Sequence, residues 1–405
     1  MRIRSLVFLT IITTFTSFCD NLHGQPLVTL VTPRQNEINV PLTSAIDATF
    51  SEDINAATLH ATTFLVYGSQ TGFYTGFLSY NAASRTARFQ PDRFFKDGES
   101  ISVTLTSAIQ NNSGQALTPV QWSFTVAVEI GTGIFDERIT VAVGENELVP
   151  ADIFAGDLNN DQFSDLAVVN SGSNSVTILI NRFVVPGGAF DPPIVVPVGS
   201  GPTSVSGGDF DSDGFIDLAV SNFDDNTVTV LRNTGVTSFV LAQTIPTAEH
   251  PTQVDARDFN NDGNLDLAAV ILGLNRLQIF LNDGNGNFAA APEVYNTGAS
   301  PYALTAADFD NDGDVDIVVS NSGDNTILVY DNNGLAQFTE SGEITVPDFP
   351  TMIRANDLVG RSPNNYGDTF VDLVITHPNI NAISIFENRS LDGGFVLSEQ
   401  IAVGV

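Results

Sequence analysis

Cysteine and basic residues are scarce in this sequence. Cys19 is the only cysteine, so the chain beyond it contains no disulfide bond. Lys and Arg together number 15 against 47 Asp and Glu, which gives a formal net charge of −32. Such a surface repels nucleic acids and anionic membranes and attracts cations. We therefore expect no nucleic-acid partner. An acidic extracellular surface adapted to salt is the alternative explanation of the charge.

Long apolar stretches are missing after residue 24, so we expect no membrane span. Residues 1–24 have the layout of a signal peptide. Arg2 and Arg4 precede an apolar stretch at 6–18 that is too short to cross a bilayer. We expect a protein that a bacterium exports and that is secreted or held at the cell surface.

The motifs of common enzymes are also missing. The sequence contains no G-x-S-x-G, no H-E-x-x-H and no phosphate-binding glycine loop. Beyond the predicted signal peptide, His60, His250 and His377 share no motif, and we predict that they are surface or turn residues. We therefore predict that the chain is not an enzyme. A hydrolase or lyase using a calcium site is the enzymatic alternative, and it would need an isolated carboxylate pair or a basic cluster in a pocket.

Residues 27–128 have the pattern of a β-sandwich. Apolar and polar residues alternate at 46–50, 101–105 and 122–126, as in strands with one buried face. About seven such strands in about 100 residues are typical of an Ig-like sandwich. Trp122 is predicted to fill its core, and a sugar-stacking platform is the alternative role.

Residues 136–405 repeat one acidic loop. Its clearest copy, at 308–316, has Asp at positions 1, 3, 5 and 9 and Gly at position 6, which is the layout of a calcium loop. Copies at 209–217 and 258–266 keep the glycine, whereas the copy at 157–165 has Gln162 there. Loop starts at 157, 209, 258, 308 and 357 give a period of about 50 residues, which indicates a solenoid, a propeller or an array.

Each repeat contains four strand-like pieces. An apolar approach precedes the loop, a continuous apolar run such as 166–169 follows it, and two further strands complete the unit. Four strands in about 50 residues are one blade of a β-propeller. The fold class is therefore all-β, with about five blades after the sandwich. Counting fourth strands, including pieces at 138–143 and 399–403, gives six. We expect either a chain truncated at Val405 before further blades, or one terminal piece outside a five-bladed ring.

Two family resemblances support this division. The segments Phe50-Ser-Glu-Asp-Ile54, Phe89-Gln-Pro91 and Trp122-Ser-Phe-Thr125 resemble the bacterial Ig-like domain of surface-layer and secreted proteins. That resemblance implies a spacer or presentation role. Phe154-Ala-Gly-Asp157, with the loop and the apolar run that follow it, resembles the FG-GAP or VCBS-type repeat of integrin-like and secreted bacterial propellers.

The FG-GAP resemblance implies calcium ligands position by position. They are Asp157, Asn159, Asp161 and Asp165 in the first loop; Asp209, Asp211, Asp213 and Asp217 in the second; Asp258, Asn260, Asp262 and Asp266 in the third; and Asp308, Asp310, Asp312 and Asp316 in the fourth. The fifth loop carries an insertion, and Asp357, Asp368 and Asp372 are its candidate ligands. Asn at position 3 lowers the ligand charge, so we expect weaker first and third sites. The alternative is that the loops are Asx turns that only link strands, although clustered ionised Asp residues would then repel one another.

These features together predict a calcium-stabilised adhesion or ligand-binding module. Ca²⁺ is the predicted cofactor, and an extracellular protein or glycan is the predicted partner. An accessory or catalytic propeller of a polysaccharide-active enzyme and a passive structural spacer are the two alternatives.

Overall fold

The protein is all-β over the residues that the structure describes. The computed structural model describes residues 25–128, 142–143, 148–161, 163–182, 189–235, 238–289, 292–356, 358, 370–389 and 394–403. These ranges contain strands and two short 3-10 turns, Ala56–Thr58 and Pro378–Ile380. The predicted signal peptide, most of the piece at 138–143, and the loop residues Asp357 and Asp368 lie outside the described residues.

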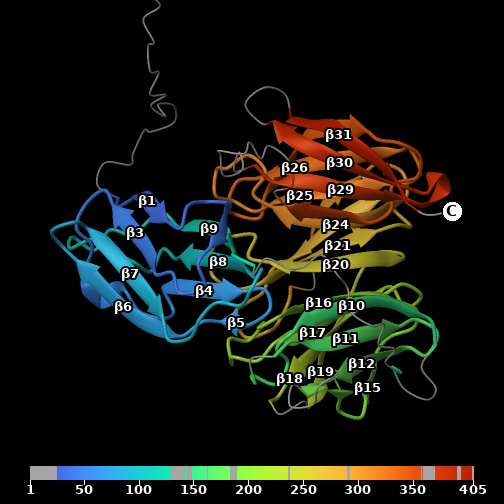
Figure 1. Cartoon of the computed structure of the whole chain (residues 1–405), viewed down its shortest axis with the longest axis horizontal. Helices are drawn as coiled ribbons and strands as arrows, with labels where there is room; N and C mark the ends of the chain where they lie inside the picture. The colour runs from blue at the N-terminus through green and yellow to red at the C-terminus, as the bar shows by residue number, and fades with distance from the viewer. Residues whose placement is uncertain are drawn as a thin grey trace, which may run out of the picture.

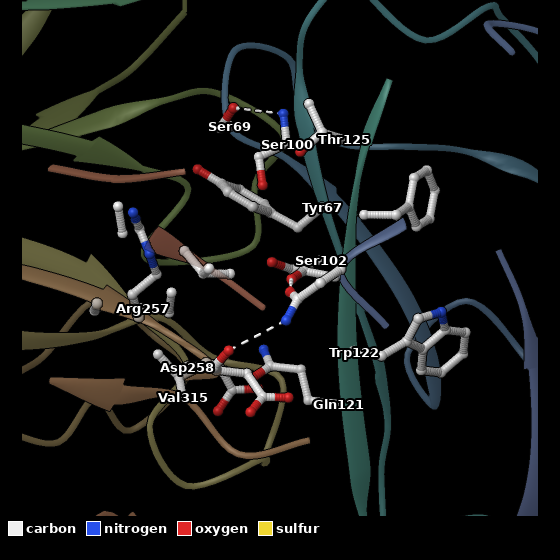
Figure 2. A pocket seen from close by; sticks show the side chains of 18 of the residues that line it. Tyr67, Ser69, Ser100, Ser102, Gln121, Trp122, Thr125, Arg257, Asp258 and Val315 are labelled. Atoms are coloured by element: carbon white, nitrogen blue, oxygen red, sulfur yellow. Dashed lines mark hydrogen bonds between the residues drawn. The ribbon is translucent and has the colours of Figure 1, made fainter. Parts of the chain in front are cut away.

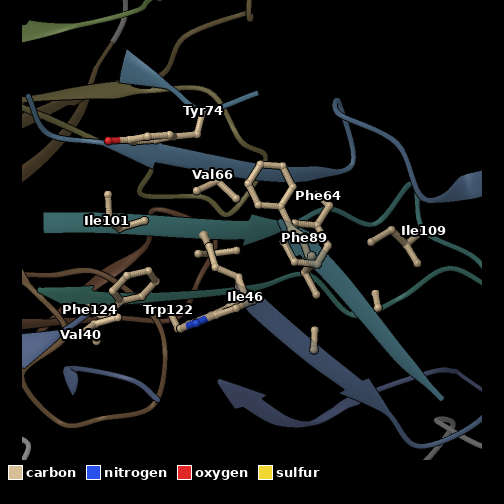
Figure 3. Packing of buried hydrophobic residues seen from close by; sticks show 14 of the residues in the cluster. Val40, Ile46, Phe64, Val66, Tyr74, Phe89, Ile101, Ile109, Trp122 and Phe124 are labelled. Atoms are coloured by element: carbon tan, nitrogen blue, oxygen red, sulfur yellow. The ribbon is translucent and has the colours of Figure 1, made fainter. Parts of the chain in front are cut away.

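The N-terminal domain is a sandwich of two sheets. One sheet has the order β1 (Val28–Thr32), β3 (Ile46–Phe50), β7 (Thr86–Pro91) and β6 (Gly76–Asn81), and the other has the order β2 (Glu37–Val40), β9 (Val120–Val126), β8 (Ser100–Leu105), β4 (Phe64–Gly68) and β5 (Gly72–Phe73). Trp122 lies in the core at 3% exposure, with its ring edge-on to Phe64 (Figure 3). The core role predicted for Trp122 is confirmed.

Five four-stranded antiparallel sheets follow, one for each repeat. Their strands, in order, are β10 (Pro150–Gly156), β11 (Asp165–Asn170), β12 (Ser175–Leu179) and β15 (Ile194–Pro197); β16 (Pro202–Gly208), β17 (Asp217–Asn222), β18 (Thr227–Asn233) and β19 (Phe239–Pro246); β20 (Pro251–Arg257), β21 (Asp266–Ile271), β22 (Arg276–Phe280) and β23 (Glu293–Asn296); β24 (Pro301–Ala307), β25 (Asp316–Asn321), β26 (Thr326–Asn332) and β27 (Phe338–Thr345); and β28 (Ile353–Asn356), β29 (Asp372–His377), β30 (Ala382–Arg389) and β31 (Gly394–Ala402). A separate two-stranded sheet, β13 (Asn181–Arg182) and β14 (Ala189–Phe190), lies between β12 and β15 in the sequence.

The five sheets are arranged as propeller blades. Each second strand is the apolar run that the sequence predicts, and β17, β21 and β25 are buried at every position because both of their faces are covered by neighbouring blades. A separate hydrophobic cluster joins each blade to the next. The first strands β10, β16, β20, β24 and β28 contact one another in sequence, and Figure 1 shows β10, β16, β20 and β24 following one another across the propeller. Among the described strands, β28 and β10 have no comparable contact. Over the described residues, the blades therefore form an open arc rather than a closed five-bladed ring.

Candidate metal centres

The acidic loops lie between the first and second strands of each blade, where the sequence predicts them. Their tight path requires two residues with positive φ. Position 4 has φ near 60° at Asn160, Ser212, Asn261 and Asn311, and position 6 has φ of 92° at Gly214, 91° at Gly263 and 98° at Gly313. Glycine adopts this conformation without strain, so the glycine at position 6 is explained by backbone geometry.

The second and fourth loops bring their carboxylates together. Carboxylate oxygens of Asp209, Asp211 and Asp217 lie within 4.8 Å of one another, and so do those of Asp308, Asp310 and Asp316. Asp308 is 4% exposed, yet its Oδ1 accepts no hydrogen bond from the described residues. Oδ1 of Asp211 is likewise buried and without a hydrogen bond there. Carboxylate-only donor sets fit a hard divalent cation such as Ca²⁺. Position 5, Asp213 and Asp312, is not part of either group.

The first and third loops are held together differently. Asn159 donates from its side-chain amide to Asp161 Oδ2 at 2.9 Å, and Asn260 donates to Asp262 Oδ2 at 3.0 Å. In both loops the Asn stands at position 3, where the second and fourth loops have one of their three clustered carboxylates. That these two sites are weaker therefore stays a prediction.

The Asp at position 9 has a structural role that the sequence analysis missed. In the fourth loop, Asp316 accepts the backbone N–H of Asn332 at Oδ1 (2.9 Å) and that of Phe309 at Oδ2 (2.9 Å). The same pair of bonds fixes the aspartates of the other loops, Asp165, Asp217, Asp266 and Asp372. In every blade the Oδ1 donor is an Asn 16 residues downstream. This constant spacing between the Asp and the Asn is visible in the sequence and could have revealed the hydrogen bond between them.

The fifth loop closes in the same way despite its insertion. Leu358 donates its backbone N–H to Asp372 Oδ2 at 2.8 Å, and Asn388 donates to Oδ1 at 2.9 Å. The two ends of the loop therefore meet as they do in the shorter loops. Asp357 and Asp368 lie outside the described residues, so the fifth calcium site stays a prediction.

The same asparagines also join neighbouring blades. Asn332 Nδ2 donates to Val315 O in its own loop at 3.0 Å and to Phe259 O in the preceding loop at 2.8 Å. Asn233, Asn282 and Asn388 make the equivalent two bonds. Each buried amide therefore ties one loop to the next.

Replacing Asn332 by Ala should destabilise the propeller by about 2–4 kcal/mol, because two buried carbonyl groups lose their donor. Asn333→Ala is the matched control, since Asn333 is exposed and bonds only to nearby side-chain and backbone groups. Urea unfolding of both variants measures the difference. Equal stabilities would show that the interblade amide bonds contribute nothing.

Burial raises the pKa values of the loop carboxyls. It raises the pKa of Asp316 to about 9 and that of Asp217 to about 8, and neighbouring carboxylates add to the effect. Burial, followed by repulsion from Asp312, raises the pKa of Asp308 to about 7. The metal-free loops are thus poorly suited to carry their full negative charge at neutral pH, and a bound cation would offset this cost.

The metal-free protein should therefore lose stability as pH rises. An Asp in the unfolded chain has a pKa near 3.9, so the folded state holds more protons between about pH 4 and pH 9. The stabilisation is complete below the unfolded value and is lost as pH passes the folded pKa values of about 7 to 9. In chelator, Tm should fall from pH 5 to pH 8.5, and saturating calcium should flatten the profile. A metal-free Tm that rises over this range would contradict the assignment.

Cationic side chains of the protein reach two of the loops. Arg232 Nε lies 2.7 Å from Asp211 Oδ2 in the second loop, and Lys96 Nζ lies 3.9 Å from Asp157 Oδ2 in the first. No such pair is formed by the described residues of the third and fourth loops. A metal ion in the second loop would compete with Arg232, so the fourth loop has the most favourable donor set.

The Ig-like sandwich covers the edge of the propeller on which these loops lie (Figure 1). Asp157 donates its backbone N–H to Gln70 O at 2.8 Å in the first loop. Thr104 Oγ1 donates to Asp258 Oδ2 at 3.2 Å in the third loop. Asn36 Nδ2 donates to Asn311 Oδ1 at 2.8 Å in the fourth loop. The loops therefore form much of the contact surface between the two domains.

The histidines are not gathered in this region. His250 occupies a turn with φ of 60°, and its ring stacks on Phe223. His377, however, is fully buried at the end of β29, where its Nδ1 lies 3.1 Å from Asp348 O. The prediction of a surface or turn position is therefore wrong for His377, because β29 extends to the residue directly before Pro378.

Comparisons with known proteins agree with this architecture. The model of the bacterial Ig-like domain matches residues 23–126, and the model of the FG-GAP-like repeat matches 157–220, 209–269, 268–319 and 308–360. No curated protein matches the chain. Among the described residues, no helix has the length and apolar character needed to cross a lipid bilayer.

Solved structures with similar backbones are distant in sequence. A protein from Lactobacillus plantarum is 14% identical, with a TM-score of 0.45, and the match covers 84% of this chain and 82% of that one. A functionally unknown protein from Desulfotomaculum acetoxidans DSM 771 is 13% identical, with a TM-score of 0.47, over 76% and 77% of the two chains. A putative 6-phosphogluconolactonase from Bacteroides fragilis NCTC 9343 is 13% identical, with a TM-score of 0.46, over 85% and 97%. The repeat matches are the informative result: the chain belongs to the FG-GAP-like repeat family and carries a bacterial Ig-like domain before its repeats.

Proposed function

We propose that this protein is an exported, non-catalytic module that binds calcium in its blade loops and an extracellular protein or glycan on the framework that these loops stabilise. The main support is the fourth loop, where three carboxylates lie within 4.8 Å and a buried oxygen of Asp308 has no hydrogen bond within the described structure. Asp308, Asp310 and Asp316 would hold the ion there, and Asp209, Asp211 and Asp217 would hold another. The ion supplies positive charge that lets the buried carboxylates ionise.

Direct calcium titration tests the metal half of this proposal. Isothermal titration calorimetry of chelator-stripped protein should detect sites in the second and fourth loops, followed by weaker ones. Asp310→Asn should remove or weaken the fourth site by at least about tenfold, since one ligand charge is lost. Asp97→Asn, an identical chemical change at an exposed turn of the sandwich, is the control. Absence of calcium binding to the unmodified protein would overturn the proposal.

Binding and catalysis assays separate the remaining classes of function. The full chain, labelled and applied to immobilised glycans and extracellular proteins, should bind in calcium and lose binding in chelator. No binding to either would favour a passive spacer. Release of new reducing ends from polysaccharides would instead favour a hydrolase or lyase.

A further inference from the structure

A cavity of about 290 Å³ lies where the sandwich meets the propeller (Figure 2). The sandwich contributes Tyr67 from β4 and Gln121 from β9, and the propeller contributes Arg257 at the end of β20 and Arg354 in β28. A second cavity of about 230 Å³ adjoins it along the first strands of the blades. Tyr67, Arg257 and Arg354 line both, so the two cavities are direct neighbours and are treated together as one space.

The two arginines are not required by the blade fold. Arg257 directly precedes the loop, and the equivalent positions of the other repeats are Gly156, Gly208, Ala307 and Asn356. Arg354 stands three residues before its loop, where the others have Phe154, Ser206, Asp255 and Thr305. Four of the five blades therefore form without a basic residue at each position. In a chain with only 15 Lys and Arg, two of them line this space.

Several groups in this space have unused hydrogen-bonding capacity. Arg354 pairs with no carboxylate among the described residues, and its Nη1 donates to the backbone O of Ile353 at 2.9 Å. Arg257 Nη1 lies 3.3 Å from Asp255 Oδ1, an oxygen that also accepts a hydrogen bond from Ser206 Oγ. The Tyr67 hydroxyl is buried and donates to no acceptor in the described structure, and Gln121 Oε1 is buried without a donor there. Buried polar groups are normally satisfied by a partner, so these point to water or a ligand.

The chemistry of these groups selects an acidic sugar. A guanidinium group presents a planar fork that matches a carboxylate. A phenolic hydroxyl and a side-chain amide provide a donor and an acceptor for sugar hydroxyl groups. We propose that this interdomain cavity binds a uronic-acid unit of a glycan, with Arg354 and Arg257 holding the carboxylate and Tyr67 and Gln121 contacting the hydroxyls. This inference rests on the proposed glycan-binding function and names its ligand class.

The net charge of the chain does not exclude such a ligand. At physiological ionic strength, charges further away than about 8 Å are largely screened, so the groups that line the space matter most. Asp152 and Asp255 line the second cavity, and Asp255 already pairs with Arg257, which leaves Arg354 as the cation without a carboxylate partner among the described residues. Asp258 and Asp308 line the first cavity, and both belong to the proposed calcium loops. Calcium should therefore be present in the binding experiment.

Titration of the full chain with D-glucuronate, in calcium and about 0.15 M salt, tests the proposal. A ligand of this size should bind with a Kd on the order of 1 mM, measurable by calorimetry or ligand-observed NMR. D-glucose should bind at least about tenfold more weakly because it lacks the carboxylate, and acetate likewise because it lacks the hydroxyls. Arg354→Gln should weaken glucuronate binding at least about tenfold, and Arg354→Lys should do so less, since it keeps the charge but loses the fork.

Arg389→Gln is the control, since Arg389 is exposed, pairs with Glu387 in β30 and lines neither cavity. Thermal melting verifies that each variant is folded, and Arg257→Gln replaces Arg354→Gln if the latter fails to fold. Glucuronate binding equal to that of glucose or acetate, or unchanged in the folded arginine variant, would overturn the inference. Calcium-dependent stability without glucuronate binding would reject this inference alone, whereas absence of calcium binding would reject the proposed function.

Discussion

Adding calcium to the chelator-stripped protein should raise Tm by about 10–20 °C. An ion present at a hundred times its Kd stabilises the folded state by about 2.7 kcal/mol per site, and two carboxylate-only loops would together contribute about 5 kcal/mol. In a domain of this size, 1 kcal/mol shifts Tm by roughly 2–4 °C. The weaker first and third loops would add to the shift. Differential scanning calorimetry with calcium varied at constant ionic strength measures it.

Two controls make this prediction specific. Magnesium should give a smaller shift, because it needs a tighter octahedral arrangement and gives up its waters reluctantly. The double variant Asp211→Asn/Asp310→Asn should lose about half of the calcium effect or more, because each change removes a carboxylate from one of the two groups within 4.8 Å. A Tm that calcium leaves unchanged in the unmodified protein would remove the metal from the proposed function.

The architecture of single blades could be predicted from the sequence because it depends on local chemistry. The continuous apolar runs become fully buried second strands such as β25, and the glycine of the fourth loop takes the positive φ that the turn requires. Both features depend on a few adjacent residues that recur once per blade. The fifth blade was harder, since the insertion hides its loop, yet Asp372 keeps its two backbone bonds.

The placement of the two domains could not be predicted in this way. The bond from Thr104 to Asp258 joins residues 154 apart, and the bond from Asn36 to Asn311 joins residues 275 apart. Neither Thr104 nor Asn36 belongs to a repeated pattern, so nothing in the spacing marks them as contacts. The interdomain cavity was missed for the same reason, although the two arginines depart from the repeat in a way that the sequence alone displays.

Chelation should also loosen the sandwich from the propeller, because the contact surface is built on the loops. Without a cation, ionised carboxylates such as Asp258 and Asp308 would repel their neighbours at pH 7.5. The Asp258 carboxylate that Thr104 contacts and the Asp308 backbone carbonyl that Asn36 contacts would then move. Separation of two compact domains should increase the radius of gyration by about 3 Å or more over the calcium-loaded value. Small-angle X-ray scattering of the full chain in calcium and in chelator measures this change.

A variant that breaks the contact without touching a ligand tests the cause. Leu65 packs against Gly263 of the third loop, so Leu65→Asp should place a charge there and expand the protein even in calcium. Leu30→Asp, on the other sheet of the sandwich and 57% exposed, should leave the radius of gyration unchanged. If chelation lowers Tm but does not change the radius of gyration, the loops stabilise their own blades and docking is independent of the ion. If both change together and Leu65→Asp reproduces only the expansion, metal occupancy controls how the sandwich is held on the propeller.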